Sequence, residues 1–192
     1  MKNIAIFASG SGTNARNIAE YFSRHENIRV TLILSNKPDA YVLERARILD
    51  IPSVVFTRKD FYESNIILDI LKNRNVDFIV LAGFLWFVPE NLLKAYPRKI
   101  INIHPALLPR HGGKGMYGDK VHQAVIADGD KETGITIHFV NDHYDEGEII
   151  FQDSFEIQPG DTAETIAQKV HQLEYNHFPR VIEEVIDGWS TK

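Results

Sequence analysis

The sequence of 192 residues contains no cysteine. Disulfide bonds, a thiol nucleophile and cysteine metal ligands are therefore excluded. The chain also lacks an excess of basic residues, because 21 Lys and Arg stand against 26 Asp and Glu and leave a formal net charge of -5 at pH 7. A chain with this balance presents no large basic surface, so nucleic acid is not an expected partner.

Long apolar runs are missing as well. The most apolar segment, residues 78–88, is much shorter than the ~20 residues that a helix needs to cross a bilayer. The N-terminus has neither the apolar core nor the cleavage signal of a secretory leader. We therefore expect no membrane partner and a cytoplasmic location. The length and the 44% share of apolar residues fit one globular domain over residues 1–192.

The order of apolar patterns predicts an α/β fold. Short β-branched runs, typical of strands, occupy residues 4–8, 30–35, 54–56, 78–82 and 100–104. Apolar residues at helical spacing lie between them, at residues 14–24, 41–49, 61–73 and 89–95. This alternation predicts a doubly wound, mostly parallel, Rossmann-like sheet with helices on both faces. In such a sheet ligands bind at the carboxyl ends of the strands, where the strand order reverses.

The pattern changes after residue 104. A loop rich in Gly and Pro covers residues 105–118, followed by a predicted helix at 120–127 and strands at 133–140 and 148–157. Asp161 and Glu164 have the spacing of a capping box, which predicts a last helix running to about residue 187. We expect residues 1–104 to bind phosphate and residues 105–192 to complete the site.

A glycine-rich turn follows the first predicted strand. Ser-Gly-Ser-Gly-Thr-Asn-Ala at residues 9–15 formally satisfies the dinucleotide pattern G-x-G-x-x-G/A. The second strand, however, ends in Ser35-Asn36-Lys37 and lacks the acidic residue that a dinucleotide site needs for the ribose. Free amides at a helix start bind anions, so the turn predicts a site for the phosphate of a small substrate. The alternative is a tight turn capped by Asn14.

Two polar residues share one face at the end of the fifth predicted strand. Asn102 and His104 are two residues apart, and Pro105 ends the strand. Their N–H groups suit an oxygen that becomes negative in a tetrahedral intermediate, and His104 can also transfer a proton. No nucleophile elbow is present, which favours direct transfer to an external nucleophile. The alternative is a hydrogen-bonded pair that only fixes the following loop.

An acidic turn joins the last two predicted strands. Within it we select Asp145 as the carboxylate partner of His104, where it would keep the imidazole charged. A solvated acidic turn is the alternative. A metal site is a further one, although neither an H-E-x-x-H helix nor an EF-hand spacing occurs, and we expect no metal.

With these residues assembled, the chain resembles the phosphoribosylglycinamide formyltransferase family, folate-dependent enzymes of purine synthesis. The resemblance covers residues 4–182. It rests on residues 9–14, Ser35-Asn36-Lys37, Leu81-Ala82-Gly83-Phe84, Asn102-Ile103-His104-Pro105 with Leu107-Leu108-Pro109, and His138-Phe139-Val140.

The resemblance implies transfer of a formyl group from 10-formyltetrahydrofolate to the primary amine of glycinamide ribonucleotide, by direct attack through a tetrahedral intermediate. It assigns the catalytic roles to Asn102, His104 and Asp145. For the ribonucleotide it implies a ribose contact by Glu174 and a phosphate contact by His171. The phosphate loop that it implies consists of Gly12, Thr13, Asn14, Ala15 and Arg16. For the folate it implies Leu85, Trp86, Phe87, Val88, Val140, Asn141 and Asp142. Residues 85–88 are alternatively plain core.

Two points depart from the family pattern or stay open. The loop at residues 110–118 carries inserted residues, and the basic residue that meets the folate tail is Arg58 or Lys59. We expect small-molecule substrates and a monomer or homodimer. The alternative functions are hydrolysis of formyltetrahydrofolate, formylation of another amine, and a nucleotide-binding module without catalysis.

Overall fold

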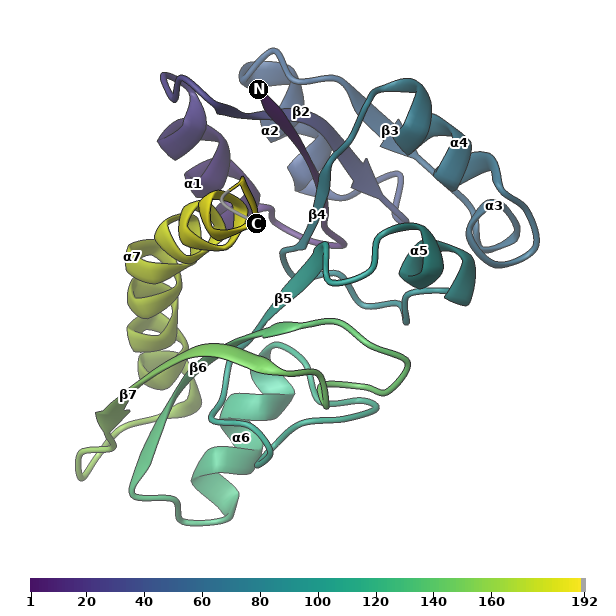
Figure 1. Ribbon diagram of the computed structural model, residues 1–192. Coiled ribbons are helices and arrows are strands. Elements are labelled where there is room, and N and C mark those ends of the chain that lie inside the picture. The colour runs from purple at the N-terminus through teal and green to yellow at the C-terminus, as the bar shows by residue number, and fades with distance from the viewer. Residues whose placement is uncertain (191–192) are drawn as a thin grey trace.

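The computed structural model describes residues 1–190, with side chains to residue 188 (Figure 1). Within the described residues the chain forms seven strands and seven helices, in the order β1 (Lys2–Phe7), α1 (Thr13–Phe22), β2 (Ile28–Ser35), α2 (Tyr41–Ile48), β3 (Ser53–Val55), α3 (Arg58–Tyr62), α4 (Ile66–Asn73), β4 (Phe78–Leu81), α5 (Glu90–Ala95), β5 (Ile100–His104), α6 (Asp119–Ala127), β6 (Glu132–Phe139), β7 (Ile149–Glu156) and α7 (Ala163–Ser190).

All the strands belong to one sheet in the order β3-β2-β1-β4-β5-β6-β7. Strands β1 to β5 pair in parallel, whereas β6 and β7 are antiparallel to their neighbours. The chain leaves β1 toward β2 on one side and later places β4 on the other side, so the order reverses between β1 and β4. The predicted doubly wound, mostly parallel fold is confirmed.

Helices cover both faces of this sheet because its central strands are apolar on both sides. In β1 the side chains alternate: Ile4 and Ile6 face the core under α1, α2, α6 and α7, whereas Ala5 and Phe7 face the core under α3, α4 and α5. All four are at most 1% exposed. The two cores hold the carboxyl ends of β1, β4 and β5 in fixed positions.

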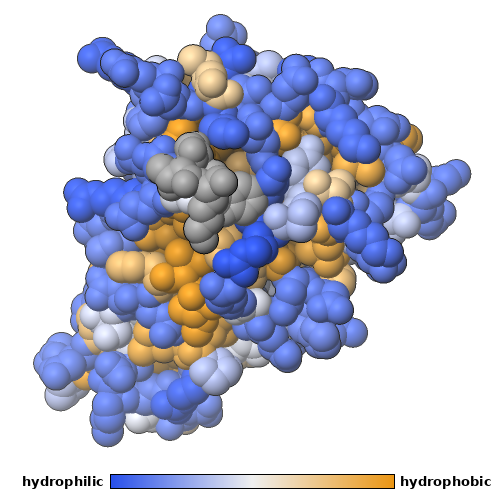
Figure 2. Space-filling model, in the orientation of Figure 1, coloured by the Kyte–Doolittle hydropathy of each residue, from blue (hydrophilic) through white to orange (hydrophobic). Residues whose placement is uncertain are grey.

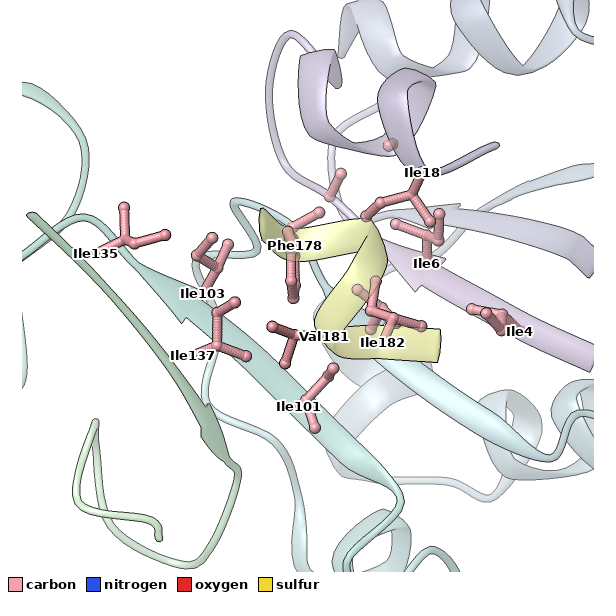
Figure 3. Packing of buried hydrophobic residues seen from close by; sticks show 14 of the residues in the cluster. Ile4, Ile6, Ile18, Ile101, Ile103, Ile135, Ile137, Phe178, Val181 and Ile182 are labelled. Carbon is pink, nitrogen blue, oxygen red and sulfur yellow. The ribbon is translucent and has the colours of Figure 1, made fainter. Parts of the chain in front are cut away.

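The long helix α7 packs across the first of these cores (Figure 3). Phe178, Val181 and Ile182 lie close to Ile101 of β5 and Ile137 of β6 in this packing. Phe178 and Ile182 are fully buried. Apolar side chains also reach the surface beside α7 and the strands β5 to β7 (Figure 2). Helix α7 therefore joins the parallel and antiparallel parts of the sheet.

Two local predictions were wrong. The single helix expected over residues 61–73 is two helices, since Thr57 and Asp60 form a capping box that starts α3 early. Ser64 then ends α3: its hydroxyl donates to the Asp60 carbonyl and accepts from the amide of Ile66.

The start of α7 also differs from the prediction. Thr162 and Thr165 bond reciprocally to each other's backbone amides, at 3.3 and 2.9 Å. Asp161 instead accepts from the ammonium of Lys169. The capping box therefore lies one residue later than the expected pair of Asp161 and Glu164.

No helix within residues 1–190 is long and apolar enough to span a bilayer.

Candidate active site

A cavity of about 760 Å³ opens at the carboxyl ends of β1, β4 and β5, next to the point where the strand order reverses. This volume is typical of sites for small organic ligands. Its wall combines the glycine turn after β1, the segment after β4, the end of β5, the loop before α6, the acidic turn between β6 and β7, and residues of α7. The cavity therefore collects the three regions that the sequence singled out separately.

The glycine turn forms one end of the cavity. Gly12 has a φ of +73°, and a Cβ at this position would lie 2.4 Å from a methyl of Val42. Ser9 holds the turn in place, because its hydroxyl donates to Asn36 at 2.7 Å and accepts from the amide of Leu85 at 3.0 Å. The start of α1 receives no side-chain cap, so its first amides are available to an anion.

Helix α7 brings a buried carboxyl to the same end. Glu174 is 6% exposed, and its Oε2 accepts from the side-chain amide of Asn14 at 2.9 Å. Burial raises the pKa of Glu174 to about 7. The other amide atom of Asn14, Oδ1, has no hydrogen-bond partner among the described residues. Such a buried, unpartnered oxygen fits a site that a polar ligand completes.

The three predicted catalytic residues meet in the middle of the cavity wall. The Nδ1 atom of His104 lies 3.6 Å from Oδ2 of Asp145, and both side chains are largely buried. The other nitrogen, Nε2, lies 2.8 Å from the backbone carbonyl of His111. A carbonyl only accepts, so Nε2 carries a proton and Nδ1 faces Asp145. Asn102 lies two residues before His104 and lines the same cavity.

His138 belongs to this cluster, although the sequence did not single it out as a site residue. Its Nδ1 donates to the carbonyl of Phe139 at 2.9 Å, which leaves Nε2 to accept from the amide of Asn102 at 3.1 Å. A register shift in the pairing of β6 with β7 lies at His138, and such bulges reorient side chains. His138 thereby fixes which end of the Asn102 amide is the donor.

Burial shifts the pKa values of His104 and Asp145 in opposite directions. Burial lowers the pKa of His104 and outweighs the opposing effect of Asp145. Burial alone raises the pKa of Asp145, but contacts with His138, His104 and the amide of Gly113 outweigh it, so that pKa is lowered. These directions favour a neutral imidazole beside an ionised carboxylate in the ligand-free site near pH 7, whereas the sequence led us to expect a charged His104.

Another part of the cavity wall is apolar and aromatic. Leu85, Trp86, Phe87 and Val88 all line the cavity, as does Val140. Val88 is also 4% exposed and packs in the core under α5, so this segment is both core and cavity wall. Arg58 completes the wall, with its guanidinium 4.9 Å from the ring centre of Tyr62.

Some predicted residues have side chains outside this cavity. Ala15 is fully buried in the core, and Arg16 points to Glu20 on the surface. Asn141 holds its own turn by accepting from the amide of His143, and Asp142 lines only a neighbouring hollow that it shares with Arg58. Of the two basic candidates for the folate tail, Arg58 lines the cavity and Lys59 does not. His171 lines the cavity, and burial lowers the pKa of its imidazole.

Two further histidines were missed by sequence reasoning. His122 lines the cavity, is 3% exposed, and has an Nδ1 without a hydrogen-bond partner among the described residues. Burial lowers the pKa of this imidazole. His138 had one usable signal, since its place in an apolar strand next to Phe139 makes a polar residue unusual there. Within residues 1–190, no group of His, Asp and Glu side chains is arranged to hold a metal ion.

The fold and site define a class: an α/β protein with a doubly wound sheet and an Asn-His-Asp cluster beside a pocket of the size that small molecules fill. Comparison with protein families matches residues 2–182 to the family described as formyl transferase. The chain belongs to this family, which confirms the resemblance noted in the sequence.

Similar proteins carry a consistent name. The chain is 40% identical over 191 residues to phosphoribosylglycinamide formyltransferase of Bacillus subtilis, covering 97% of this chain and 95% of that protein. It is 42% identical over 187 residues to a chloroplastic protein of the same name from Arabidopsis thaliana, covering 94% of this chain but 64% of the plant protein. The chain spans 60% of a second such relative, from Vigna unguiculata.

Solved structures agree with the sequence relatives. The crystal structure of phosphoribosylglycinamide formyltransferase from Bacillus halodurans superimposes with a TM-score of 0.86 at 36% identity, over 96% of this chain and 95% of that one. Glycinamide ribonucleotide transformylase 1 from Geobacillus kaustophilus gives a TM-score of 0.86 at 39% identity, over 95% of this chain and 97% of that one. Because two plant relatives are chloroplastic, the cytoplasmic location expected from the sequence stays a prediction.

Proposed function

We propose that this chain transfers a formyl group from 10-formyltetrahydrofolate to the primary amine of glycinamide ribonucleotide, a step of purine biosynthesis, and that residues 1–192 act as one domain. The observation that carries the proposal is the convergence of Asn102, His104 and Asp145 on one cavity whose two ends differ in chemistry. One end offers helix amides and a buried carboxyl, which suit a ribose phosphate. The other is aromatic and ends at a basic residue, which suits a folate.

The residues at the aromatic end fit a folate by size and chemistry. A flat pterin ring requires apolar faces and backbone hydrogen bonds, which the segment 85–88 and Val140 offer at the cavity wall. Arg58 lies at the junction with the neighbouring hollow, where its guanidinium can meet the carboxylates of the folate tail. When bound there, the folate supplies the formyl group, and this chain's residues orient it.

Asn102 and His104 assist the attack of the amine on the formyl carbon. The side-chain amide of Asn102, whose direction His138 fixes, donates to the formyl oxygen as negative charge develops on it. Neutral His104 has its Nδ1 lone pair on the side of Asp145, so it accepts the proton that the attacking amine must lose. The ionised Asp145 stabilises the imidazolium that results. The bond between the formyl carbon and N10 of the folate then breaks, and the imidazolium of His104 returns its proton to that nitrogen, so that tetrahydrofolate leaves without a covalent enzyme intermediate.

The glycine turn and α7 position the ribonucleotide. Amides at the start of α1, from Gly12 to Asn14, bind the phosphate, and His171 adds a contact from α7. Glu174 accepts from the ribose hydroxyls, and the unpartnered Oδ1 of Asn14 accepts another ligand proton. A ribonucleotide bound by these groups would direct its amine toward Asn102 and His104, which line the same cavity.

Glu174 has a measurable effect on stability. Burial raises the pKa of its carboxyl in the folded chain from the ordinary 4.5 to about 7. Between these two values the folded state holds a proton that the unfolded state has lost, so stability falls as pH rises through that window, by about 3 kcal/mol. Glu174→Gln is expected to abolish this fall in urea unfolding at pH 5 and pH 8. It is also expected to raise the KM for the ribonucleotide.

The matched control is Glu184→Gln, which removes an exposed carboxyl from the same helix. It is expected to keep the wild-type pH dependence. If Glu174→Gln retained the same fall in stability between the two pH values, the buried carboxyl would not be its source.

Arg58 and Lys59 provide a matched pair for the folate tail. Arg58→Ala is expected to raise the KM for the folate about tenfold with little change in kcat, because a hydrogen bond to a charged group contributes about 1.5 kcal/mol. Lys59→Ala is expected to leave both constants unchanged, since Lys59 does not line the cavity. Steady-state kinetics with a varied folate concentration measures the difference. Equal effects of the two substitutions would place the tail elsewhere.

The proposed reaction is tested by mixing the protein with 10-formyltetrahydrofolate, with and without glycinamide ribonucleotide, and following the folate spectrum. Loss of the formyl donor only when the ribonucleotide is present is the expected result. Loss without the ribonucleotide would indicate a hydrolase, and loss with a different amine would change the acceptor. No loss in any mixture would favour a nucleotide-binding module.

A further inference from the structure

The segment 110–113, between β5 and α6, touches the catalytic cluster with its backbone. The carbonyl of His111 accepts from Nε2 of His104 at 2.8 Å. Two residues later, the amide of Gly113 donates to Oδ2 of Asp145 at 3.0 Å. Between them Gly112 packs so closely on Leu108 that a Cβ would lie 2.5 Å from a methyl of that residue, and the same Cβ would be in ordinary contact with Asp145 at 3.4 Å. This short segment therefore contacts two of the three residues assigned to catalysis.

The side chains of the same segment point away from the cavity and bind the turn between α6 and β6. Nε2 of His111 lies 2.7 Å from Oδ2 of Asp130, and both side chains are nearly buried, at 7% and 4% exposed. Arg110 places its guanidinium on the other carboxylate oxygen of Asp130. Asp128 lies farther away, with its Oδ2 3.8 Å from Nδ1 of His111 and its side chain 60% exposed.

The contact of His111 with Asp130 stabilises a segment that has no regular secondary structure. The segment contains neither helix nor strand, and His111 has a φ of +53°, in the left-handed region. Residues other than glycine adopt that region at a cost, which surrounding contacts must offset. The contact between His111 and Asp130, whose side chains are both nearly buried, holds this segment from outside the cavity.

The position of the His111 carbonyl determines the chemistry of His104. A carbonyl only accepts, so it requires the proton of a neutral His104 to be on Nε2. Nδ1 is then left unprotonated on the side of Asp145. Without this carbonyl, either nitrogen could carry the proton, and one of the two tautomers has no base directed at an attacking amine.

We propose that His111 and Asp130 form a positioning latch, which holds the His111 carbonyl against His104 and thereby fixes the Nε2–H tautomer of the catalytic imidazole. His111 and Asp130 are positioning residues, because they act through His104 rather than on the substrates. The kinetic part of the inference rests on the proposed formyl transfer. The structural part does not, since a tautomer is observable without any reaction.

The direct test is long-range ¹H–¹⁵N NMR of histidine side chains, which distinguishes the two neutral tautomers and the imidazolium. In the ligand-free wild-type protein near pH 7, His104 is expected to show a protonated Nε2 and an unprotonated Nδ1. An Nδ1–H tautomer or an imidazolium there would overturn the proposal without any variant. The result holds whether or not the protein transfers formyl groups, so failure of the latch and failure of the proposed function are distinguishable.

Two variants then distinguish the effect of losing the contact between His111 and Asp130 from the effect of losing the fold. His111→Asn retains a residue type that tolerates a positive φ but is too short to reach Asp130, and Asp130→Ala removes the other partner. Both are expected to give His104 signals that are a mixture of tautomers. They should lower kcat about 10- to 100-fold with little change in the KM for either substrate, as misplacement of a catalytic group does.

Asp128→Ala is the matched control, since it removes the distant and exposed carboxylate of the same turn. It is expected to leave the His104 spectrum and kcat as in the wild type. Folded His111→Asn protein with an unchanged Nε2–H tautomer would overturn the latch. If Asp130→Ala failed to fold, the wild-type spectrum and His111→Asn would still decide the question.

Discussion

Replacing His104 by alanine is expected to lower kcat for formyl transfer about 10²- to 10⁴-fold, the range for loss of a positioned general base. The imidazole lies 3.6 Å from Asp145 and is not among the groups assigned to the phosphate. The substitution should therefore leave the KM for the ribonucleotide nearly unchanged. Stopped-flow measurement of folate release at saturating ribonucleotide gives kcat directly.

The control for this prediction is His177→Ala. His177 binds Asp153 at 2.8 Å and does not line the cavity, so the substitution removes an imidazole without touching the site. It is expected to keep kcat within about twofold of the wild type, as surface changes away from a site do. Circular dichroism would show that both variants are folded. Undiminished turnover by folded His104→Ala protein would remove His104 from the mechanism.

Replacing Phe178 by alanine is expected to lower the free energy of unfolding by about 3–5 kcal/mol, the cost of truncating a buried aromatic ring. Phe178 is fully buried, and α7 packs through it and its neighbours against both β5 and β6 (Figure 3). The cavity left by the ring would lie where the parallel and antiparallel parts of the sheet meet. Urea unfolding followed by circular dichroism measures the loss.

Ile126→Ala is the comparison for the core prediction. Ile126 lies on α6 and is 39% exposed, so its truncation is expected to cost about 1 kcal/mol or less. Equal losses in the two variants would mean that the interface of α7 with the sheet does not carry the stability assigned to it. Because Glu174 is also on α7, folded Phe178→Ala protein should bind the ribonucleotide more weakly while His104 still functions.

The sequence predicted the order of elements because that order depends on local patterns. The apolar runs and helical spacings lie within one element each, and most of the predicted bounds differ from the structure by one or two residues. The end of β5 at His104 was predicted because Pro105 cannot continue the strand. Asn102, His104 and Asp145 were found as single residues by their chemistry and place at strand or turn ends.

The sequence could not predict contacts that depend on register and packing across the chain. His138 meets Asn102 because β5 and β6 pair in antiparallel register, 36 residues apart. Asn14 meets Glu174 across 160 residues because α7 crosses α1. The position of His111 depends on a loop without regular structure. The contact of His111 with the buried Asp130 determines the path of that loop. None of these has a periodic signal in the sequence.

The most direct test of the central claim compares single-turnover formyl transfer in Asn102→Ala, His104→Ala, Asp145→Ala and the triple variant. Residues that act as one unit have strongly non-additive effects. We predict that each single variant is slow and that the triple variant is no slower than about the slowest single one. Independent effects that multiply in the triple variant, or a folded single variant with wild-type rate, would contradict a concerted role for the three residues.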